Sequence, residues 1–226
     1  MSDNKRRIRS YVLRAARMSE AQKKAYDELF PKWGIPFRQG FLDWNAAFGR
    51  DGKRIVEIGF GMGDATRRMA VVKPEWNILG VEVHRPGVGK LLWWMEQESL
   101  ENIRVIEHDA VEVLQNVLEP GSVDGFHIWF PDPWPKKRHH KRRLIQPELV
   151  EHLVRVLKPG GYIHAATDWE HYACHILAVL NGHPNLENRF EQWAPKPDYR
   201  PDTKFENRGL TAGRQIRDII FEKGNV

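Results

Sequence analysis

The feature of this chain that most constrains its fold is the alternation of short apolar runs with longer helical patterns over residues 54–167. The apolar runs read RIVEIGF, NILGVEV, NIRVIEHD, SVDGFHIWF and YIHAATD. Strands that alternate with helices in this way are typical of βαβ units, in which successive strands are parallel. We predict helices that begin near Pro86, that span residues 110–118, and that include Leu149, Leu153 and Leu157 before a Pro-Gly-Gly stop.

An acidic residue stands at or next to the end of every predicted strand: Glu57, Glu82, Asp109, Asp132 and Asp168. The carboxyl ends of parallel strands line one edge of an open sheet, and ligands bind in the crevice there. An acid at one such position is most often a helix N-cap, and this alternative is the better one for Asp109 or Asp168 considered alone. Because all five ends carry an acid, we predict an acidic ligand site along this edge.

A glycine-rich segment, VEIGFGMGDA, places Gly59, Gly61 and Gly63 at the predicted turn after the first strand. Glycines at this point let a ligand approach the backbone. A dinucleotide-binding G-x-G-x-x-G motif requires Gly or Ala at position 64, but the residue is Asp64, and Asp64 and Glu57 would both repel a pyrophosphate. The segment therefore suits a ligand with a positive charge and no phosphate.

S-adenosylmethionine is such a ligand, because it carries a sulfonium and an amine. Glu82 is placed to accept from both ribose hydroxyls, and Asp109 from the adenine amino group. Together with the acidic edge, these positions predict a class I methyltransferase.

The sequence FPDPWPKKRHHKRRL, residues 130–144, follows the fourth predicted strand. Asp132 would lie at the methyl end of the cofactor, held in place by prolines on both sides, and is the candidate catalytic residue. Trp134 is a candidate stacking surface or a structural wall. His139 and His140 have no nearby Cys and no spaced carboxylate pair, so we predict no metal site.

Positive charge is concentrated in two segments of this chain. Residues 136–143 carry six Lys or Arg, and residues 5–17 carry another six with no acid. Without these twelve cations the formal net charge of +5 becomes −7. A solvated charged surface is the simpler alternative for any one basic run, but the segregation predicts a protein that meets a polyanion along one side.

Cysteine content and hydropathy limit where such a protein acts. Cys174 is the only cysteine, which excludes an intrachain disulfide and a cluster of Cys ligands for zinc. No apolar run approaches the roughly 18 residues of a membrane helix. We expect one soluble globular protein in the cytoplasm.

Seven motifs together give this chain a close resemblance to the bacterial tRNA (guanine-N7)-methyltransferase family over nearly its whole length. They read RSYVLRAARMSEAQ, VEIGFGMG, GVEVHRPGVG, HDA, FPDPWPKKRHHKRRL, ATDWEHYA and RPDTKFENRG. The resemblance implies methylation of N7 of guanine 46 in the tRNA variable loop, with S-adenosylmethionine as cofactor. It also implies an α/β, Rossmann-like class I methyltransferase fold, with a mostly parallel seven-stranded sheet and helices on both faces.

The resemblance also assigns site residues. Cofactor binding is implied for Glu57, Glu82, Asp109 and Asp132, besides Gly59, Gly61 and Gly63 of the glycine loop. Substrate binding is implied for Lys136, Asp168, Thr203, Lys204, Phe205 and Glu206. Asp168 or Glu206 could select guanine by accepting from its N1–H and N2 amine. Contacts to RNA are expected from Arg138, His139, His140, Lys141, Arg142 and Arg143.

The expected organisation is a basic N-terminal arm with helices over residues 1–50, followed by a methyltransferase domain over residues 51–226. The segment QIRDIIFE near the end resembles an added edge strand. We expect a monomer or homodimer with tRNA as partner and no obligatory partner protein. The alternatives are a methyltransferase of another RNA, a small molecule or a protein, an RNA-binding protein without catalysis, and a nucleotide-dependent oxidoreductase.

Overall fold

The protein is described from a computed structural model, which describes residues 9–11 and 17–224. Much of the basic segment 5–17 and residues 12–16 of the motif RSYVLRAARMSEAQ therefore lie outside the described residues. The strands are β1 (Lys53–Ile58), β2 (Trp76–Glu82), β3 (Ile103–Glu107), β4 (Val123–Trp129), β5 (Leu157–Thr167), β6 (Leu186–Asn188) and β7 (Arg217–Lys223). The helices are α1 (Glu20–Trp33), α2 (Trp44–Phe48), α3 (Asp64–Val72), α4 (Arg85–Gln97), α5 (Ala110–Asn116), the 3₁₀ helix η1 (Lys137–Arg142), α6 (Pro147–Val156), α7 (Glu170–Asn181) and α8 (Lys204–Thr211).

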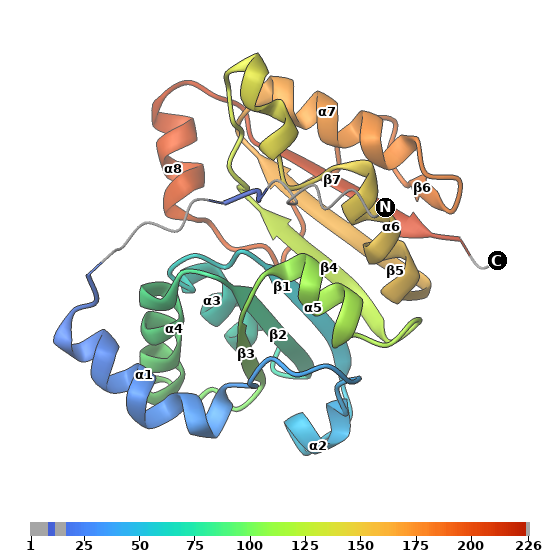
Figure 1. The fold of residues 1–226 in the computed structure, drawn as a ribbon. Coiled ribbons are helices and arrows are strands. Elements are labelled where there is room, and N and C mark those ends of the chain that lie inside the picture. Colours follow the sequence, from blue (N-terminus) through green and yellow to red (C-terminus); the bar gives the residue numbers. More distant parts are fainter. Residues whose placement is uncertain (1–8, 12–16, 225–226) are drawn as a thin grey trace, which may run out of the picture.

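The strands form one sheet of seven in the order β3-β2-β1-β4-β5-β7-β6 (Figure 1). Strands β1 to β5 are mutually parallel, and β7 runs antiparallel to both β5 and β6. This confirms the predicted α/β fold with a mostly parallel seven-stranded sheet. The carboxyl ends of β1 to β5 consequently meet at one edge, as the strand-end acids required.

Helices cover both faces of the sheet, because the side chains of each strand alternate between the faces. Ile55 of β1 packs into a core with residues of α1, α3 and α4, whereas Val56 packs into a second core with residues of α2, α5, α6 and α7 (Figure 1). α1 belongs to this body, since its Trp33 is 1% exposed. No helix among the described residues is long and apolar enough to span a membrane.

Two predicted elements differ from the structure. The segment at the C-terminus forms β7, which is an interior strand between β5 and β6 and not the edge; the short β6 takes the edge. The helix α6 ends at Val156, and Leu157 already begins β5, whose Lys158 to Gly161 stretch continues the strand. Helical spacing predicted that Leu157 continues the apolar face of this helix. Instead, the Ser122 N–H donates to the Val156 carbonyl, and Leu157 pairs with Val123 at the start of β4 and β5.

Candidate functional site

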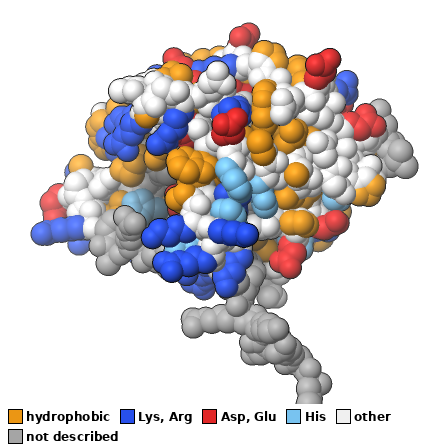
Figure 2. Space-filling view, turned by 90° about the horizontal axis from the view of Figure 1, so that it is seen from above, with side chains coloured by type: hydrophobic (Ala, Val, Ile, Leu, Met, Phe, Trp, Pro, Cys, Tyr) orange, Lys and Arg blue, Asp and Glu red, His pale blue; other side chains and the backbone are white. Residues whose placement is uncertain are grey.

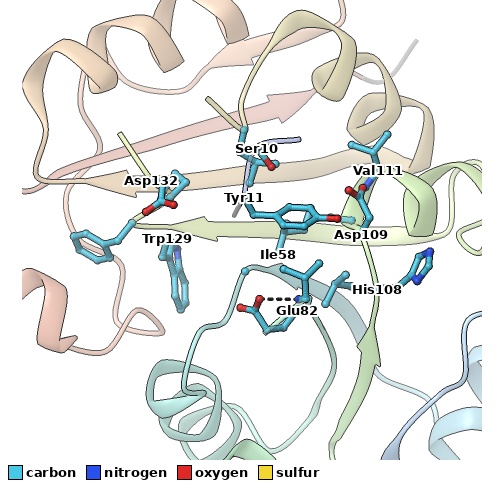
Figure 3. A pocket seen from close by; sticks show the side chains of 16 residues that line it. Ser10, Tyr11, Ile58, Glu82, His108, Asp109, Val111, Trp129 and Asp132 are labelled. Carbon is cyan, nitrogen blue, oxygen red and sulfur yellow. Dashed lines mark hydrogen bonds between the residues drawn. The ribbon is translucent and has the colours of Figure 1, made fainter. Parts of the chain in front are cut away.

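A cavity opens at the carboxyl edge of the sheet, where the ends of β1, β2, β3 and β4 meet (Figure 3). Three of the predicted acids line it: Glu82, Asp109 and Asp132. Glu57 and Asp168 are not among the lining residues. Ser10 and Tyr11 of the N-terminal segment close one side, and Figure 3 shows the Tyr11 ring among the three acids. The sheet edge therefore forms a pocket with three of the five predicted acids on its wall.

The glycine loop takes a backbone conformation that favours glycine. Gly59 and Gly61 have φ values of +78° and +59°, and a Cβ on either would meet no atom within 4 Å. The space beside both residues is therefore open to a ligand. A Cβ on Gly87, in the first turn of α4, would come within 1.9 Å of the Gly61 carbonyl oxygen, so the helix packs directly against the loop.

Glu82 ties the glycine loop to the turn that follows β2. Its Oε2 accepts from the Gly61 N–H at 2.8 Å, and its Oε1 accepts from the N–H groups of Val83 and His84 at 2.7 and 2.9 Å. Burial raises the pKa of Glu82, and these backbone donors oppose that rise. An ionised carboxylate has about four acceptor positions. The three backbone N–H groups occupy three of these positions. The carboxylate can therefore accept both predicted ribose hydroxyls only if one hydroxyl shares an acceptor position with a backbone N–H.

Asp109 has two roles at the end of β3. Its side chain accepts from the Val111 N–H at 2.9 Å and so caps α5, which is the helix-capping alternative raised for this residue. The same residue, 7% exposed, also forms part of the cavity wall. The cap holds the carboxylate at the wall.

Glu57 lies behind the cavity. It points to the same face of the sheet as Ile55, toward α3, and its Oε2 is buried without a hydrogen-bond partner among the described residues. Burial raises the pKa of Glu57 to about 7; the Thr66 hydroxyl lowers it and the Glu82 charge raises it further. A buried carboxyl of this kind gains a partner if a cationic ligand binds nearby.

Asp132 lies on a loop whose backbone is unusual on both sides of it. Phe130 and Trp134 have φ values of +52° and +43°, and each directly precedes a proline. The Phe130 N–H donates to the Ala166 carbonyl at 2.7 Å, which ties the loop to β5. Asp132 itself is exposed and faces the cavity (Figure 3). Positive φ in bulky residues is strained and concentrates at functional sites.

Trp134 is a structural wall of the rim. Its Nε1 donates to the Ser10 carbonyl at 3.1 Å, Arg142 lies over its ring at 5.1 Å, and His139 meets it edge-on at 5.9 Å. The indole thus has protein contacts at its ring and at its Nε1–H, which favour the structural wall over the stacking surface.

The basic run forms η1 and its flanks on the rim. Lys136, Lys137, Arg138 and Lys141 are exposed, and His139, His140 and Arg142 are half-buried. Figure 2 shows Lys and Arg side chains on either side of a hollow in this face. No group of His, Cys, Asp and Glu suited to a metal ion occurs in the described part of the chain.

Arg143 is a correction to the predicted RNA contacts, because it is only 2% exposed. Its Nε donates to the Pro133 carbonyl at 3.0 Å, its Nη2 lies 3.0 Å from His171 Nδ1, and its guanidinium lies over the Tyr172 ring at 4.9 Å. A guanidinium held by these contacts braces the loop from inside, although its Nη1 is buried without a hydrogen-bond partner among the described residues. The charge pattern of the run gave no sign that its last member turns inward.

The four predicted substrate residues from 203 to 206 divide into two pairs. Lys204 and Phe205 are exposed, Phe205 to 58%. Thr203 instead caps α8 by accepting from the Glu206 N–H at 3.0 Å. Glu206 is 4% exposed, and its two oxygens accept from Arg200 and Lys196 at 2.6 and 3.0 Å. Because both oxygens of this carboxylate are already paired in the interior, a contact of Glu206 with guanine would require these pairs to open, and it stays a prediction.

Asp168 remains the candidate carboxylate for the guanine edge. It stands directly after β5 and accepts from Arg214 Nη1 at 2.7 Å. Both side chains are partly exposed, at 19% and 46%, so this ion pair can open toward a substrate.

Comparison with known proteins identifies the family of this chain. A model of a family of putative methyltransferases matches residues 51–219. A tRNA (guanine-N(7)-)-methyltransferase of Burkholderia lata is 58% identical over 218 residues, which cover 96% of this chain and 86% of the relative. One of Chromobacterium violaceum is 56% identical over 219 residues, which cover 97% of each chain. The chain belongs to the tRNA (guanine-N(7)-)-methyltransferase family. The resemblance drawn from the motifs is thereby confirmed.

Two solved structures share the fold of this tRNA (guanine-N(7)-)-methyltransferase family member. The antibiotic-resistance methyltransferase Kmr superposes with a TM-score of 0.56 at 16% identity, over 80% of this chain and 92% of its own. The 16S rRNA methyltransferase KamB superposes with a TM-score of 0.55 at 14% identity, over 85% and 97%. These likenesses show the fold and confirm the predicted Rossmann-like class.

Several residues of the family member's site were not predicted from its sequence. Tyr11, Trp129 and Phe130 line the cavity, and Arg200 anchors the segment that leads into α8. Phe130 stands in a predicted strand end, where an aromatic residue is ordinary. Tyr11, Phe130 and Arg200 each lie within one of the family motifs, whereas Trp129 lies in none of them.

Proposed function

We propose that this protein transfers the methyl group of S-adenosylmethionine to N7 of a guanine in tRNA, at position 46 of the variable loop. The observation that carries the proposal is an acidic cavity at the sheet edge that opens directly beside a cationic rim. Carboxylates suit a cationic cofactor, and exposed cations suit RNA phosphates. Family membership supports the same reaction.

The residues of the cavity fit this cofactor. Open space beside Gly59 and Gly61 admits a ligand to the backbone, and Glu82 and Asp109 offer carboxylate acceptors for its ribose and adenine groups. The negative wall disfavours a pyrophosphate. When bound, S-adenosylmethionine supplies an electrophilic methyl group.

The guanine N7 lone pair lies in the ring plane and carries no proton, so attack on the methyl carbon requires no general base. The N7–C bond forms as the C–S bond breaks, and positive charge passes to the purine ring. Asp132, fixed at the cavity mouth, favours this charge as it develops. Its role in this scheme is electrostatic and positional.

The proposal extends to the setting of the reaction. Action in the cytoplasm is supported by a single cysteine, Cys174, which suits a reducing compartment. The protein acts as a monomer or a homodimer, without an obligatory partner protein. Light scattering on the purified protein, with and without tRNA, measures its oligomeric state.

The test of the reaction uses purified protein, labelled S-adenosylmethionine and separate pools of tRNA, rRNA, protein and small metabolites. Label should enter tRNA alone, as 7-methylguanine. A tRNA transcript with adenine at position 46 should accept none, whereas a transcript changed elsewhere in the loop should accept normally. Label in rRNA, protein or a metabolite would instead support a methyltransferase with another substrate.

We predict that salt dependence reports the contribution of the basic run to tRNA binding. With Arg143 buried, five exposed or half-buried cations remain in residues 136–142. Neutralising about five phosphates gives a log–log slope of roughly −3.5 to −4.5 for the binding constant against salt. Replacing Lys136, Lys137 and Arg138 by Gln should flatten this slope by about 2.

The matched control for that measurement replaces three exposed lysines of α1, Lys23, Lys24 and Lys32, by Gln. It changes net charge equally but away from the rim, so the slope should stay within about 0.5 of the wild-type value. Equal flattening by both triple variants would show that η1 has no special place in binding.

Glu57 gives a prediction on pH. Its pKa is about 7 in the folded protein and 4.5 ordinarily, so the unfolded chain releases this proton first as pH rises. Stability is therefore lost between about pH 4.5 and 7, by about 3 kcal/mol in total. Glu57→Gln has no such loss. Its free energy of unfolding, relative to that of the wild type, should therefore rise by about 3 kcal/mol as the pH increases from 5 to 8.

Urea denaturation of both proteins at several pH values measures this difference. Glu75→Gln, at an exposed position, is the control and should follow the wild-type pH profile. Parallel profiles for Glu57→Gln and the wild type would contradict a raised pKa at Glu57.

A further inference from the structure

Two phenylalanines from distant parts of the chain meet at the mouth of the cavity. Phe130 follows β4 and lines the cavity next to Asp132, and Phe205 stands in the first turn of α8. Their rings are nearly parallel, at 19°, with centroids 6.4 Å apart. Phe205 is among the most exposed large apolar side chains in the described residues, at 58%. An exposed aromatic face beside a ligand cavity has a functional reason more often than a scattered surface residue does.

Arg200 contacts the Phe130 ring and the residue that follows Phe205. Its guanidinium lies 5.9 Å from the Phe130 centroid, and its Nη1 donates to Glu206, the residue that follows Phe205. Its Nη2 also donates to Asp218 of β7 at 2.9 Å. The side chain of Arg200 is fully buried, so these contacts fix the start of α8 to the sheet.

The same network reaches the residue before Phe130. Trp129 Nε1 donates to His164 Nδ1 at 3.3 Å, which makes Nδ1 the acceptor nitrogen. His164 Nε2 therefore carries the proton and donates to Asp218 Oδ1 at 2.8 Å. One buried set of polar contacts therefore runs from Trp129, which precedes Phe130, to Arg200, which pairs with the residue after Phe205. These contacts fix the backbone beside both phenylalanines.

We propose that Phe130 and Phe205 form an aromatic wall against which the acceptor guanine stacks, with Arg200 as the residue that positions the wall. Purine bases stack on aromatic side chains without regard to their edges. Methylation at N7 makes the purine cationic, and an aromatic face attracts a cation. The wall therefore stabilises the transition state more than the neutral guanine, which is the condition for accelerating the reaction.

The positive φ of Phe130 supports this role. Its backbone holds a strained conformation, at φ +52°, and the residue is half-buried. The strain places the ring beside Asp132 at the cavity mouth, where the acceptor must approach the methyl group. The alternative is that Phe130 only fills space between the loop and the core.

This inference rests on the proposed function, and the experiment separates the two. Single-turnover methylation of one tRNA transcript, the KM for tRNA and the dissociation constant for S-adenosylmethionine are measured for Phe130→Leu, Phe205→Leu and Phe130→Tyr. Phe41→Leu is the matched control, because Phe41 is also 58% exposed but does not line the cavity. Thermal unfolding checks that each variant is folded.

Each Leu variant should lower the single-turnover rate by on the order of ten-fold, with the cofactor dissociation constant changed less than two-fold. Phe130→Tyr, which keeps the ring, should lose clearly less than Phe130→Leu, and Phe41→Leu should retain the wild-type rate. Wild-type rates in both Leu variants, or losses matched by weaker cofactor binding, would overturn the wall. A wild-type protein that makes no 7-methylguanine in tRNA contradicts the proposed function before any variant is compared.

Discussion

Replacing Asp132 by Asn should lower the single-turnover rate of methylation by on the order of a hundredfold or more. Asn keeps the shape of the side chain and the loop around it but removes the negative charge at the cavity mouth. The lost charge would otherwise favour the cation that forms on the guanine ring. Because N7 carries no proton, the residual rate of the variant should change little between pH 6 and 9.

The measurement is single-turnover methylation of one tRNA transcript across that pH range, for the variant and the wild type. Asp51→Asn, at an exposed position that does not line the cavity, is the control and should keep the wild-type rate. A variant that recovers with added carboxylate or at high pH would point to proton removal by Asp132. An unchanged rate would remove Asp132 from the mechanism.

Replacing Arg200 by Ala should destabilise the protein by about 3 to 5 kcal/mol. Arg200 pairs with Glu206 and Asp218, which are 4% exposed each, so its removal leaves two buried carboxylates without their shared cation. Breaking a buried ion pair from one side is costly because the remaining charge keeps its desolvation penalty. The largest structural effect is expected at α8, whose first turn contains Glu206.

Urea denaturation at pH 7 measures this loss, and Arg208→Ala provides the control. Arg208 lies on the same helix but is exposed, so its removal should change stability by less than about 0.5 kcal/mol. Burial raises the pKa of Asp218, but hydrogen bonds from His164 and Arg200 outweigh burial and hold this pKa below its ordinary value. The deficit of Arg200→Ala relative to the wild type should therefore shrink as the pH falls through that pKa. A deficit under 1 kcal/mol at pH 7 would contradict the role assigned to this network.

The acidic site could be predicted from sequence because its elements obey local rules. Alternation of apolar runs with helical spacing defines parallel strands, and parallel strands bring their carboxyl ends together whatever the details of packing. Glu82, Asp109 and Asp132 follow three such ends and do line one cavity. Gly59 and Gly61 likewise leave open space beside the backbone at the turn after the first strand, as the glycine pattern predicted.

What depends on contacts between distant segments was not predicted. Arg143 continues a run of surface cations, yet the Pro133 carbonyl and the Tyr172 ring draw it inward. Glu206 stands in a charged loop, yet Arg200 pairs with it inside the protein. In both cases the side chain's neighbours lie on other parts of the chain, and the balance between hydration and burial is decided by those neighbours.

The sequence by itself determined the α/β class and the sheet edge at which Glu82, Asp109 and Asp132 line the cavity, because each follows from periodicity within a few residues. Only the tertiary structure decided that β7 lies inside the sheet and that Phe130 meets Phe205. Strand order and side-chain contact join residues that are far apart in the chain. Such pairings depend on how whole surfaces fit together, and no local pattern specifies them.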